Sequence, residues 1–116
     1  MALTVKLAGQ DYCYVTTTGR VTGKPRTIEI WFGAAGDTLY LLSGGRDRSD
    51  WVRNMRKTPE VSVRIGRRRF AARARIVRAR TKEDALARRL LLEKYARYDD
   101  LDDWGRTALT VALDAG

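Results

Sequence analysis

Apolar and polar residues alternate along much of the chain, which is the pattern of strands with one buried face. In Arg26–Phe32, every second position from Ile28 to Phe32 is apolar, and Glu29 lies between them. Alternation of this kind, with many Val, Ile, Thr and aromatic residues, predicts six strands. The expected strands are Asp11–Thr18, Arg26–Phe32, Thr38–Leu42, Val61–Ile65, Arg69–Arg80 and Thr107–Leu113.

Two segments have a helical pattern instead. A short helix is expected over residues 50–57, where a serine and an aspartate can form the N-cap and a proline follows the end. Thr81, with Asp84 three residues later, predicts a capping box that opens a longer helix over residues 81–98. The acidic stretch 99–104 is expected to be a polar connection. Residues expected to face the core include Phe70, Ala72, Ala74, Ile76, Val77, Ala85, Leu86, Leu90, Leu91 and Leu92.

The expected strands follow one another mostly as hairpins, and the sequence has no repeated β–α–β pattern. A meander of about six strands closes most easily into an antiparallel barrel, because closure removes exposed strand edges. A length of 116 residues is a common size for one domain. We therefore expect a single domain, residues 1–116, of the mainly β or α+β class.

The composition excludes several kinds of catalysis. The chain has no histidine and a single cysteine, Cys13. It therefore lacks a Ser-His-Asp triad, a Cys-His dyad and any histidine-ligated metal site, and no metal is expected. Cys13 is expected to be a small packed residue. If the protein is an enzyme, a bound cofactor is the simplest carrier of its chemistry.

Basic residues are concentrated in the middle of the chain. The net charge is +9, and residues 44–80 hold 13 Lys and Arg against 3 acidic residues. This excess attracts nucleic acid, an anionic membrane surface or a phosphorylated or carboxylated ligand, and a solvated surface explains it equally well. The run Arg67–Arg69 suggests a nucleic-acid-binding barrel as one alternative. Such barrels use several exposed aromatic residues, whereas Phe70 is the one aromatic residue between Arg64 and Arg80.

The sequence shows neither a targeting segment nor a membrane span. Residues 1–10 contain no sustained apolar segment, and no uncharged stretch approaches the roughly 20 apolar residues that a span requires. A single cysteine also fits a reducing compartment. We expect a soluble cytoplasmic protein without stable membrane insertion.

The segment TTTGRVTGKPR, residues 16–26, carries the first chemical signal. Arg20, Lys24 and Arg26 lie within seven residues, on a loop that Gly23 and its neighbours make tight. Glycines let backbone N–H groups approach an anion closely, and Arg and Lys add charged hydrogen bonds to phosphate or carboxylate. A purely structural turn and an anion site both remain open on this pattern.

The segment LLSGGRDRSDWVRNMRKTP, residues 41–59, carries the second signal. A strand ends in Ser-Gly-Gly and leads into the short helix, whose N-terminal N–H groups can bind an anion. Trp51 lies in the first turn of this helix, and Asn54 follows on the same face. Trp51 can equally be a core residue and Asn54 a surface residue.

Together with IEIWF and DTLYLLSGG, these two segments resemble the deazaflavin-dependent nitroreductase family, whose members use coenzyme F420. The resemblance covers nearly the whole chain and is strongest from Tyr12 to Gly66. It implies a split β-barrel, the fold of the flavin-binding pyridoxamine-phosphate oxidases. It also implies that the loop holds the acidic tail of the coenzyme and that the Ser-Gly-Gly turn and the helix start lie near its phosphate and ring. The cofactor-binding residues implied in this way are Arg20, Thr22, Gly23, Lys24, Arg26, Ser43, Gly44, Gly45, Trp51 and Asn54.

The resemblance leaves the acceptor side of the site less defined. Family members often line it with tyrosines from the later helix, for which Tyr95, Tyr98 and Trp104 are the candidates here, although they can equally be core and surface aromatics. Glu29 departs from the family, which often has proline at this position. The long N-terminal amphipathic segment of some members is also missing.

The activity implied by the resemblance is hydride transfer from the reduced deazaflavin to an electron-poor acceptor, namely a quinone, a nitro compound or an activated alkene. The cofactor carries the hydride, so no catalytic protein residue is expected, and a proton would come from water or a tyrosine. FMN is the alternative cofactor, although its single phosphate needs fewer cations than this loop offers. Split barrels often pair, so a homodimer is a possible assembly.

Overall fold

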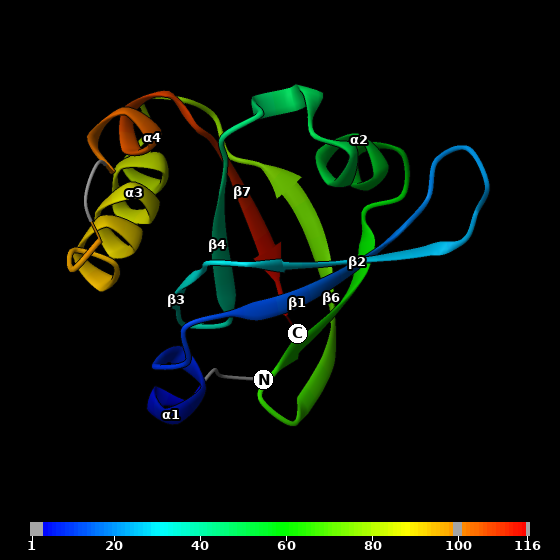
Figure 1. Ribbon diagram of the computed structural model, residues 1–116, viewed down its shortest axis with the longest axis horizontal. Coiled ribbons are helices and arrows are strands. Elements are labelled where there is room, and N and C mark those ends of the chain that lie inside the picture. Colours follow the sequence, from blue (N-terminus) through cyan, green and yellow to red (C-terminus); the bar gives the residue numbers. More distant parts are fainter. Residues whose placement is uncertain (1–3, 99–100, 116) are drawn as a thin grey trace.

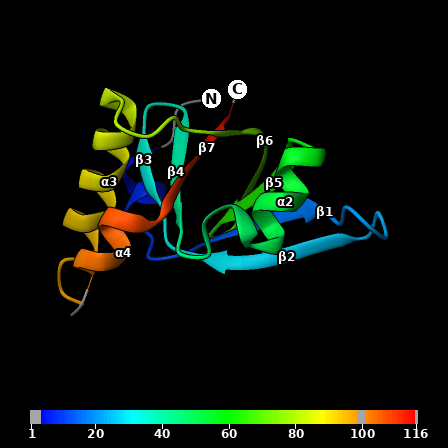
Figure 2. The same cartoon turned by 90° about the horizontal axis from the view of Figure 1, so that it is seen from above.

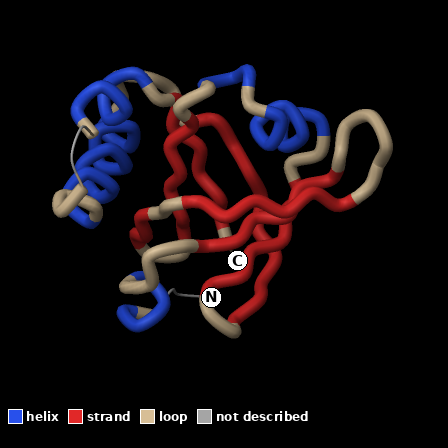
Figure 3. The backbone as a smooth tube through the Cα atoms, viewed as in Figure 1, coloured by secondary structure: helices blue, strands red, loops and turns tan. Residues whose placement is uncertain are grey.

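One antiparallel sheet organises the molecule (Figures 1 and 3). The computed structural model describes residues 4–98 and 101–115. The order of the strands across the sheet is β2-β1-β5-β6-β7-β4-β3, and every neighbouring pair is antiparallel. The strands are β1 (Cys13–Thr18), β2 (Pro25–Ile30), β3 (Gly33–Ala35), β4 (Thr38–Ser43), β5 (Glu60–Ile65), β6 (Arg68–Ile76) and β7 (Leu109–Asp114).

The sheet curls into a half-open barrel because its two edge strands are neighbours in sequence. β2 and β3 lie at opposite ends of the strand order, yet only Trp31 and Phe32 separate them in the chain. The interior is filled by alternate residues of the strands, as the strand pattern requires. Fully buried residues of this core include Val15, Phe32, Leu39, Leu41, Ile65, Val111 and Leu113. The predicted small antiparallel barrel is therefore confirmed.

The alternation of β5 follows the prediction, whereas the end of β6 does not. Val61, Val63 and Ile65 are all buried. Ile76 was expected to face the core but is 40% exposed. The last register pair between β5 and β6 is at Arg73, and beyond it β6 pairs with β7 alone. Ile76 therefore lies where one side of β6 has no strand neighbour, and the expected strand to Arg80 ends at Ile76.

Two helices cover different sides of the barrel (Figure 2). Helix α2 (Asp50–Lys57) has the predicted bounds and buries Val52 and Met55 in the barrel core. Helix α3 (Lys82–Lys94) packs against β3 and β4 and begins at the predicted cap, because Thr81 Oγ1 accepts a hydrogen bond from the Asp84 N–H at 3.1 Å. Ala85 was expected to face inward but is exposed, and Ala87 is buried in its place.

The sequence pattern missed four short elements: β3, α1 (Val5–Ala8), the 3-10 turn η1 (Arg46–Arg48) and α4 (Asp102–Thr107). The three helical elements are shorter than two α-helical turns and β3 has three residues, so none of them establishes a period in the sequence. Helix α4 occupies the second half of the stretch 99–104 that was expected to be a polar connection, so that expectation is wrong from residue 102 onward. Residues 99 and 100 lie outside the described part of the chain. Within residues 4–98 and 101–115, no helix has the length and apolar character that membrane crossing requires.

Candidate functional site

The loop between β1 and β2 is a structured turn that extends beyond the rest of the molecule (Figures 1 and 2). The Gly19 N–H donates to the Lys24 carbonyl, and the Gly23 N–H donates to the Gly19 carbonyl, both at 2.8 Å. Gly23 has φ +74°, a left-handed conformation that favours glycine. Thr22 Oγ1 accepts from the Lys24 N–H at 3.2 Å. The hydrogen bonds explain the turn, and they leave the cationic side chain of Lys24 exposed.

Asn54 holds Arg20 from the neighbouring helix. Its Oδ1 accepts from the Arg20 backbone N–H at 3.1 Å and from Arg20 Nη1 at 3.0 Å, and its Nδ2 donates to Thr17 Oγ1 at 3.1 Å. Lys57 Nζ donates to the Arg20 carbonyl at 2.8 Å, and Asp50 pairs with the guanidinium at 3.0 Å. Asn54 is 4% exposed, so it is not a surface residue. The Arg20 guanidinium is therefore fixed in place before any ligand arrives.

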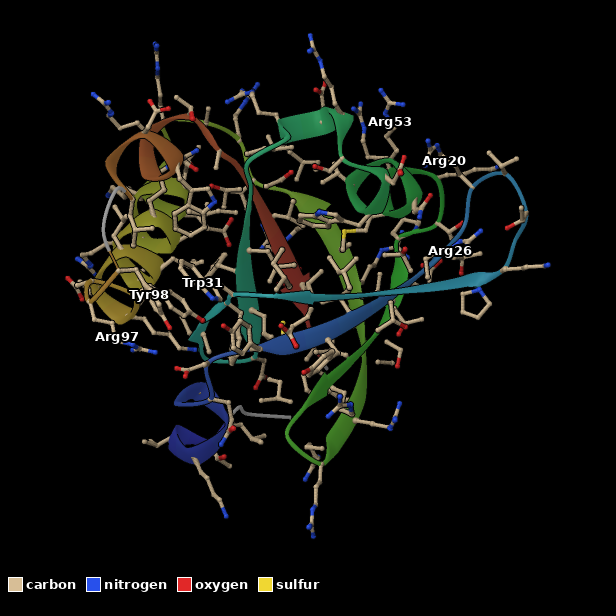
Figure 4. The ribbon with its side chains drawn as sticks, in the orientation of Figure 1. Arg20, Arg26, Trp31, Arg53, Arg97 and Tyr98 are labelled. Carbon is tan, nitrogen blue, oxygen red and sulfur yellow. The ribbon has the colours of Figure 1, made fainter. Side chains whose placement is uncertain are left out.

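A groove of about 630 Å³ lies between this loop and α2, and we call it the hairpin groove. Its walls are loop residues 19–22, residues 25–28 of β2, and residues of α2 that include Trp51 and Asn54. Arg20 and Arg26 supply its positive charge, and Asp50 supplies one negative charge. Figure 4 shows Arg20 and Arg26 where the loop meets α2, with Arg53 nearby on that helix.

The Ser-Gly-Gly turn, residues 43–45, follows β4 and is hydrogen-bonded to the residue that precedes α2. Ser43 Oγ donates to the Arg46 carbonyl at 2.8 Å and shares a hydrogen bond of 2.8 Å with Ser49 Oγ. A Cβ on Gly45 would lie 2.5 Å from Ser49 Oγ, so a larger residue here would displace the Ser49 hydroxyl from its bond with Ser43. Ser49 is the N-cap of α2 but makes no side-chain capping bond. The backbone N–H groups of the first turn of α2 are therefore not satisfied by this side chain and can bind an anion.

An aromatic cluster lies at the opposite end of β2, beside α3 and α4. The Trp31 ring stacks on Tyr95 with centroids 4.2 Å apart and an angle of 5° between the planes. Tyr98 lies 4.9 Å from Trp31, and Trp104 meets it edge-on at 5.7 Å. Figure 4 shows Trp31 and Tyr98 together at this end of the molecule. The three aromatic candidates of the sequence are thus brought together, and Trp31, which the sequence did not single out, lies at their centre.

The three candidates differ in how they meet solvent. Tyr95 is fully buried; its hydroxyl accepts from the Phe32 N–H at 3.0 Å and donates to the Asp11 carbonyl at 2.7 Å. Burial raises the pKa of the Tyr95 hydroxyl above its usual range. Tyr98 is 40% exposed, and Trp104 is half-buried. Tyr95 therefore anchors the cluster from beneath, whereas Trp104 reaches the surface of a cavity.

That cavity has a volume of about 360 Å³, and we call it the aromatic cavity. It is lined by Tyr12, Glu29, Ile30, Trp31, Leu42, Leu101 and Trp104. A Cβ on Gly44 would lie 3.6 Å from Trp104, so the Ser-Gly-Gly turn borders Trp104. Residues 25–28 of β2 line the hairpin groove. The next residues along the chain, Glu29, Ile30 and Trp31, line the aromatic cavity. The two hollows therefore follow one another along a single edge strand.

Cys13 takes no part in either hollow. Its side chain is fully buried, and burial raises the pKa of the thiol to about 12. A thiol in this state is neutral at physiological pH and is a poor nucleophile. The expectation of a small packed residue is confirmed.

The curled antiparallel half-barrel is a split β-barrel, and a cationic groove and an aromatic cavity lie along its edge strand β2. Solved structures agree on this fold. One is the structure of an F420-H2 dependent reductase (FDR-A), with TM-score 0.73, 22% identity and coverage of 90% of this chain and 94% of that one. Another is a putative pyridoxamine 5'-phosphate oxidase of Listeria innocua, with TM-score 0.71, 16% identity and coverage of 94% and 86%.

The chain belongs to the F420H2-dependent quinone reductase family, which it matches over residues 2–115. This is a family of oxidoreductases whose cofactor is reduced coenzyme F420. A curated relative is the F420H2-dependent quinone reductase Rv1261c of Mycobacterium tuberculosis, 34% identical over 64 residues. That match covers 53% of this chain and 43% of the relative, so the chain spans about half the length of the curated relative it matches.

Proposed function

We propose that this chain binds reduced coenzyme F420 along β2 and transfers a hydride from it to a quinone. The observation that carries the proposal is the succession of the two hollows along one strand, the first cationic and the second aromatic. Coenzyme F420 has a matching order of parts, because a polyanionic tail of phosphate and glutamate residues is joined to a flat aromatic ring. The protein and the coenzyme are therefore complementary in charge and in order.

The hairpin groove suits the tail. Arg20 is fixed by Asn54 and Asp50, and Arg26 lines the groove from β2. Guanidinium groups bind carboxylate and phosphate through two parallel hydrogen bonds. Thr22 lines the same groove, and the neighbouring Gly23 and Lys24 add a permissive backbone and an exposed cation. These residues would hold the phosphate and carboxylate groups of the tail.

The start of α2 and the aromatic cavity suit the rest of the coenzyme. The turn Ser43–Gly45 and the first N–H groups of α2 lie between the two hollows and would receive the phosphate nearest the ring. Trp51 lines the groove at this point, and Asn54 acts by holding Arg20. Trp31 and Trp104 give the cavity flat apolar walls against which a deazaflavin ring and a flat acceptor can pack.

Reduced F420 supplies the hydride when it is bound, and the side chains of this protein provide binding, orientation and exclusion of water. The apolar walls of Ile30, Leu42 and Trp104 keep water from the ring. Reduction of a quinone also consumes a proton. The hydroxyl of Tyr12, which lines the cavity, and solvent at the cavity mouth are the available sources.

The quinone is the acceptor that the family name supports. Nitro compounds and activated alkenes are further acceptors within this proposal, because they share the electron-poor centre that a hydride attacks. FMN would use the same fold, but its single phosphate would leave part of the Arg20 and Arg26 charge unused. A homodimer stays a prediction.

The test is a comparison of ligands and of turnover. We expect the purified chain to bind F420 with micromolar or tighter affinity, followed by cofactor fluorescence, and to bind FMN and single-stranded DNA at least tenfold more weakly. Menadione should restore the visible absorbance of oxidised F420 when it is added to the reduced cofactor and protein. Arg26→Ala should weaken F420 binding about tenfold through the lost charged hydrogen bonds, whereas the remote Arg67→Ala should not. Tight FMN or DNA binding without an F420 response would overturn the proposal.

A further inference from the structure

Glu29 is the one charged residue among those that line the aromatic cavity in the described part of the chain. The strand pattern explains its position. Ile28 and Ile30 are partly buried against the barrel core, whereas Glu29 between them is exposed, as alternation along β2 requires. Its neighbours around the cavity are aromatic or aliphatic, apart from the Tyr12 hydroxyl. A carboxylate at this place is therefore a distinct chemical feature of the cavity.

The carboxylate is held in position by Tyr14. Tyr14 and Glu29 are directly opposite each other in the β1–β2 ladder, and Tyr14 Oη donates to Glu29 Oε2 at 2.6 Å. The Arg64 guanidinium lies over the Tyr14 ring, 4.1 Å from its centroid, and so supports that ring from β5. This bond uses one carboxylate oxygen. In residues 4–98 and 101–115 Glu29 makes no other hydrogen bond, so Oε1 stays available to solvent or a ligand.

The charge of Glu29 is also uncompensated by an ion pair within the same described residues. The surrounding cations have other hydrogen-bond partners. Arg64, over the Tyr14 ring, donates to the Gly66 carbonyl at 2.6 Å, Arg97 pairs with Asp11 at 3.0 Å, and Lys94 donates to the Phe32 carbonyl at 3.0 Å. The chain as a whole carries a net charge of +9, which by itself would attract anionic acceptors. An unpaired carboxylate at the cavity mouth acts locally against that attraction.

We infer that Glu29 is a specificity-determining residue for the acceptor: it favours acceptors with a positive charge or a hydrogen-bond donor and disfavours anionic ones. The inference rests on the proposed function for the identity of the acceptor as a quinone. Its physical basis is that specificity arises as much from an unfavourable contact with the wrong ligand as from a favourable contact with the right one. An anionic substituent placed beside Oε1 would meet a like charge, and because Glu29 is exposed, solvent screens part of this repulsion.

The test uses three quinones and does not require the cofactor. Menadione is the uncharged probe, 1,4-naphthoquinone-2-sulfonate is the anionic probe, and a naphthoquinone with a trimethylammonium group is the cationic probe. Trp31 and Trp104 line the cavity, so quenching of tryptophan fluorescence reports binding in the absence of F420. Glu29→Gln removes the charge and keeps an oxygen that can accept from Tyr14. Glu60→Gln is the matched control, because Glu60 is an exposed acid that pairs with Arg73 on another part of the sheet.

We expect Glu29→Gln to tighten binding of the anionic probe about fivefold and to weaken binding of the cationic probe about fivefold, an effect of the size of one partly screened charge contact. Menadione binding should stay within about twofold, and Glu60→Gln should leave all three probes within about twofold. Equal responses of the three probes to Glu29→Gln, or the same shifts in Glu60→Gln, would overturn the inference. F420 binding is measured on the same samples. Its absence in the unaltered chain would refute the proposed function alone, because the quenching experiment still reports the role of Glu29.

Discussion

Replacement of Asn54 by alanine tests how the hairpin groove is built. The change removes three hydrogen bonds: two from Arg20 to Oδ1 and one from Nδ2 to Thr17. Neutral bonds contribute about 1 kcal/mol each, and the bond from the guanidinium about 2 kcal/mol, for about 4 kcal/mol in all. The Arg20 side chain is 30% exposed, so water replaces part of the charged bond. We expect Asn54→Ala to lower the free energy of unfolding by about 3 kcal/mol.

The same substitution should weaken binding of the cofactor. Without Asn54, the Arg20 backbone and guanidinium are free to move, and the cost of ordering them falls on the binding step. We expect F420 affinity to decrease at least about tenfold, which corresponds to about 1.4 kcal/mol. Urea unfolding measures the first quantity, and cofactor fluorescence measures the second. Arg56→Ala is the control, since Arg56 lies on the same helix, is exposed and does not line the hairpin groove.

A double-mutant cycle with Thr17→Val isolates one of the three bonds. Thr17 is 2% exposed, and valine has nearly the same shape without the hydroxyl. We expect a coupling free energy of about 1 kcal/mol between the two substitutions. If Asn54→Ala lowers the free energy of unfolding by less than about 0.5 kcal/mol and leaves F420 affinity unchanged, the view that Asn54 organises the groove is refuted.

Three further predictions concern buried polar groups. Burial alone would raise the pKa of Asp84, but hydrogen bonds from Thr110, Arg88 and the Arg80 N–H hold it below its usual value. The stabilisation is therefore present at neutral pH and is lost as the pH falls below about 4 toward the lowered pKa. Asp84→Asn should cost about 3 kcal/mol at pH 7 and less at pH 3, measured by urea unfolding; an equal loss at both would contradict this. Tyr95→Phe should lower the free energy of unfolding by about 2 kcal/mol, because the Phe32 N–H and the Asp11 carbonyl both lose a hydrogen-bond partner. An unchanged urea midpoint would contradict the stabilising role of the Tyr95 hydroxyl. Cys13, with its pKa raised to about 12 by burial, should resist iodoacetamide at pH 8 in the folded chain and react in urea, as followed by mass spectrometry; fast labelling of the folded chain would show that the thiol is accessible.

The sequence was sufficient for the parts of the fold that depend on local period. The alternation of β5 and the bounds of α2 follow directly from which residues are apolar, and the cap at Thr81 follows from a local hydrogen bond. The cations of the loop were visible for the same reason, because they lie within a few residues of one another. Ile76 was misjudged because its exposure depends on where β5 ends, which alternation within β6 does not reveal.

The parts that escaped prediction depend on distant partners. Asn54 is buried because Arg20 and Thr17 satisfy it, and these lie 34 and 37 residues away in sequence. Trp31 occupies the polar side of an alternating strand, and its role became clear only from the stacking with Tyr95. A tryptophan on the polar side of a strand was the one available signal. Tyr95, for which the sequence left both a cavity wall and a core residue open, is the buried residue.

The central claim is that the tail of F420 lies in the hairpin groove and its ring in the aromatic cavity. The most direct measurement compares F420 with its tail-less precursor, the free deazaflavin ribityl compound, in two variants. Arg26→Ala changes the groove, and Trp104→Leu changes the cavity. We expect Arg26→Ala to weaken binding of F420 about tenfold and binding of the precursor less than about twofold. Trp104→Leu should weaken binding of both ligands to a similar degree. Equal loss of both ligands in Arg26→Ala, or unchanged binding of both in Trp104→Leu, would contradict the account.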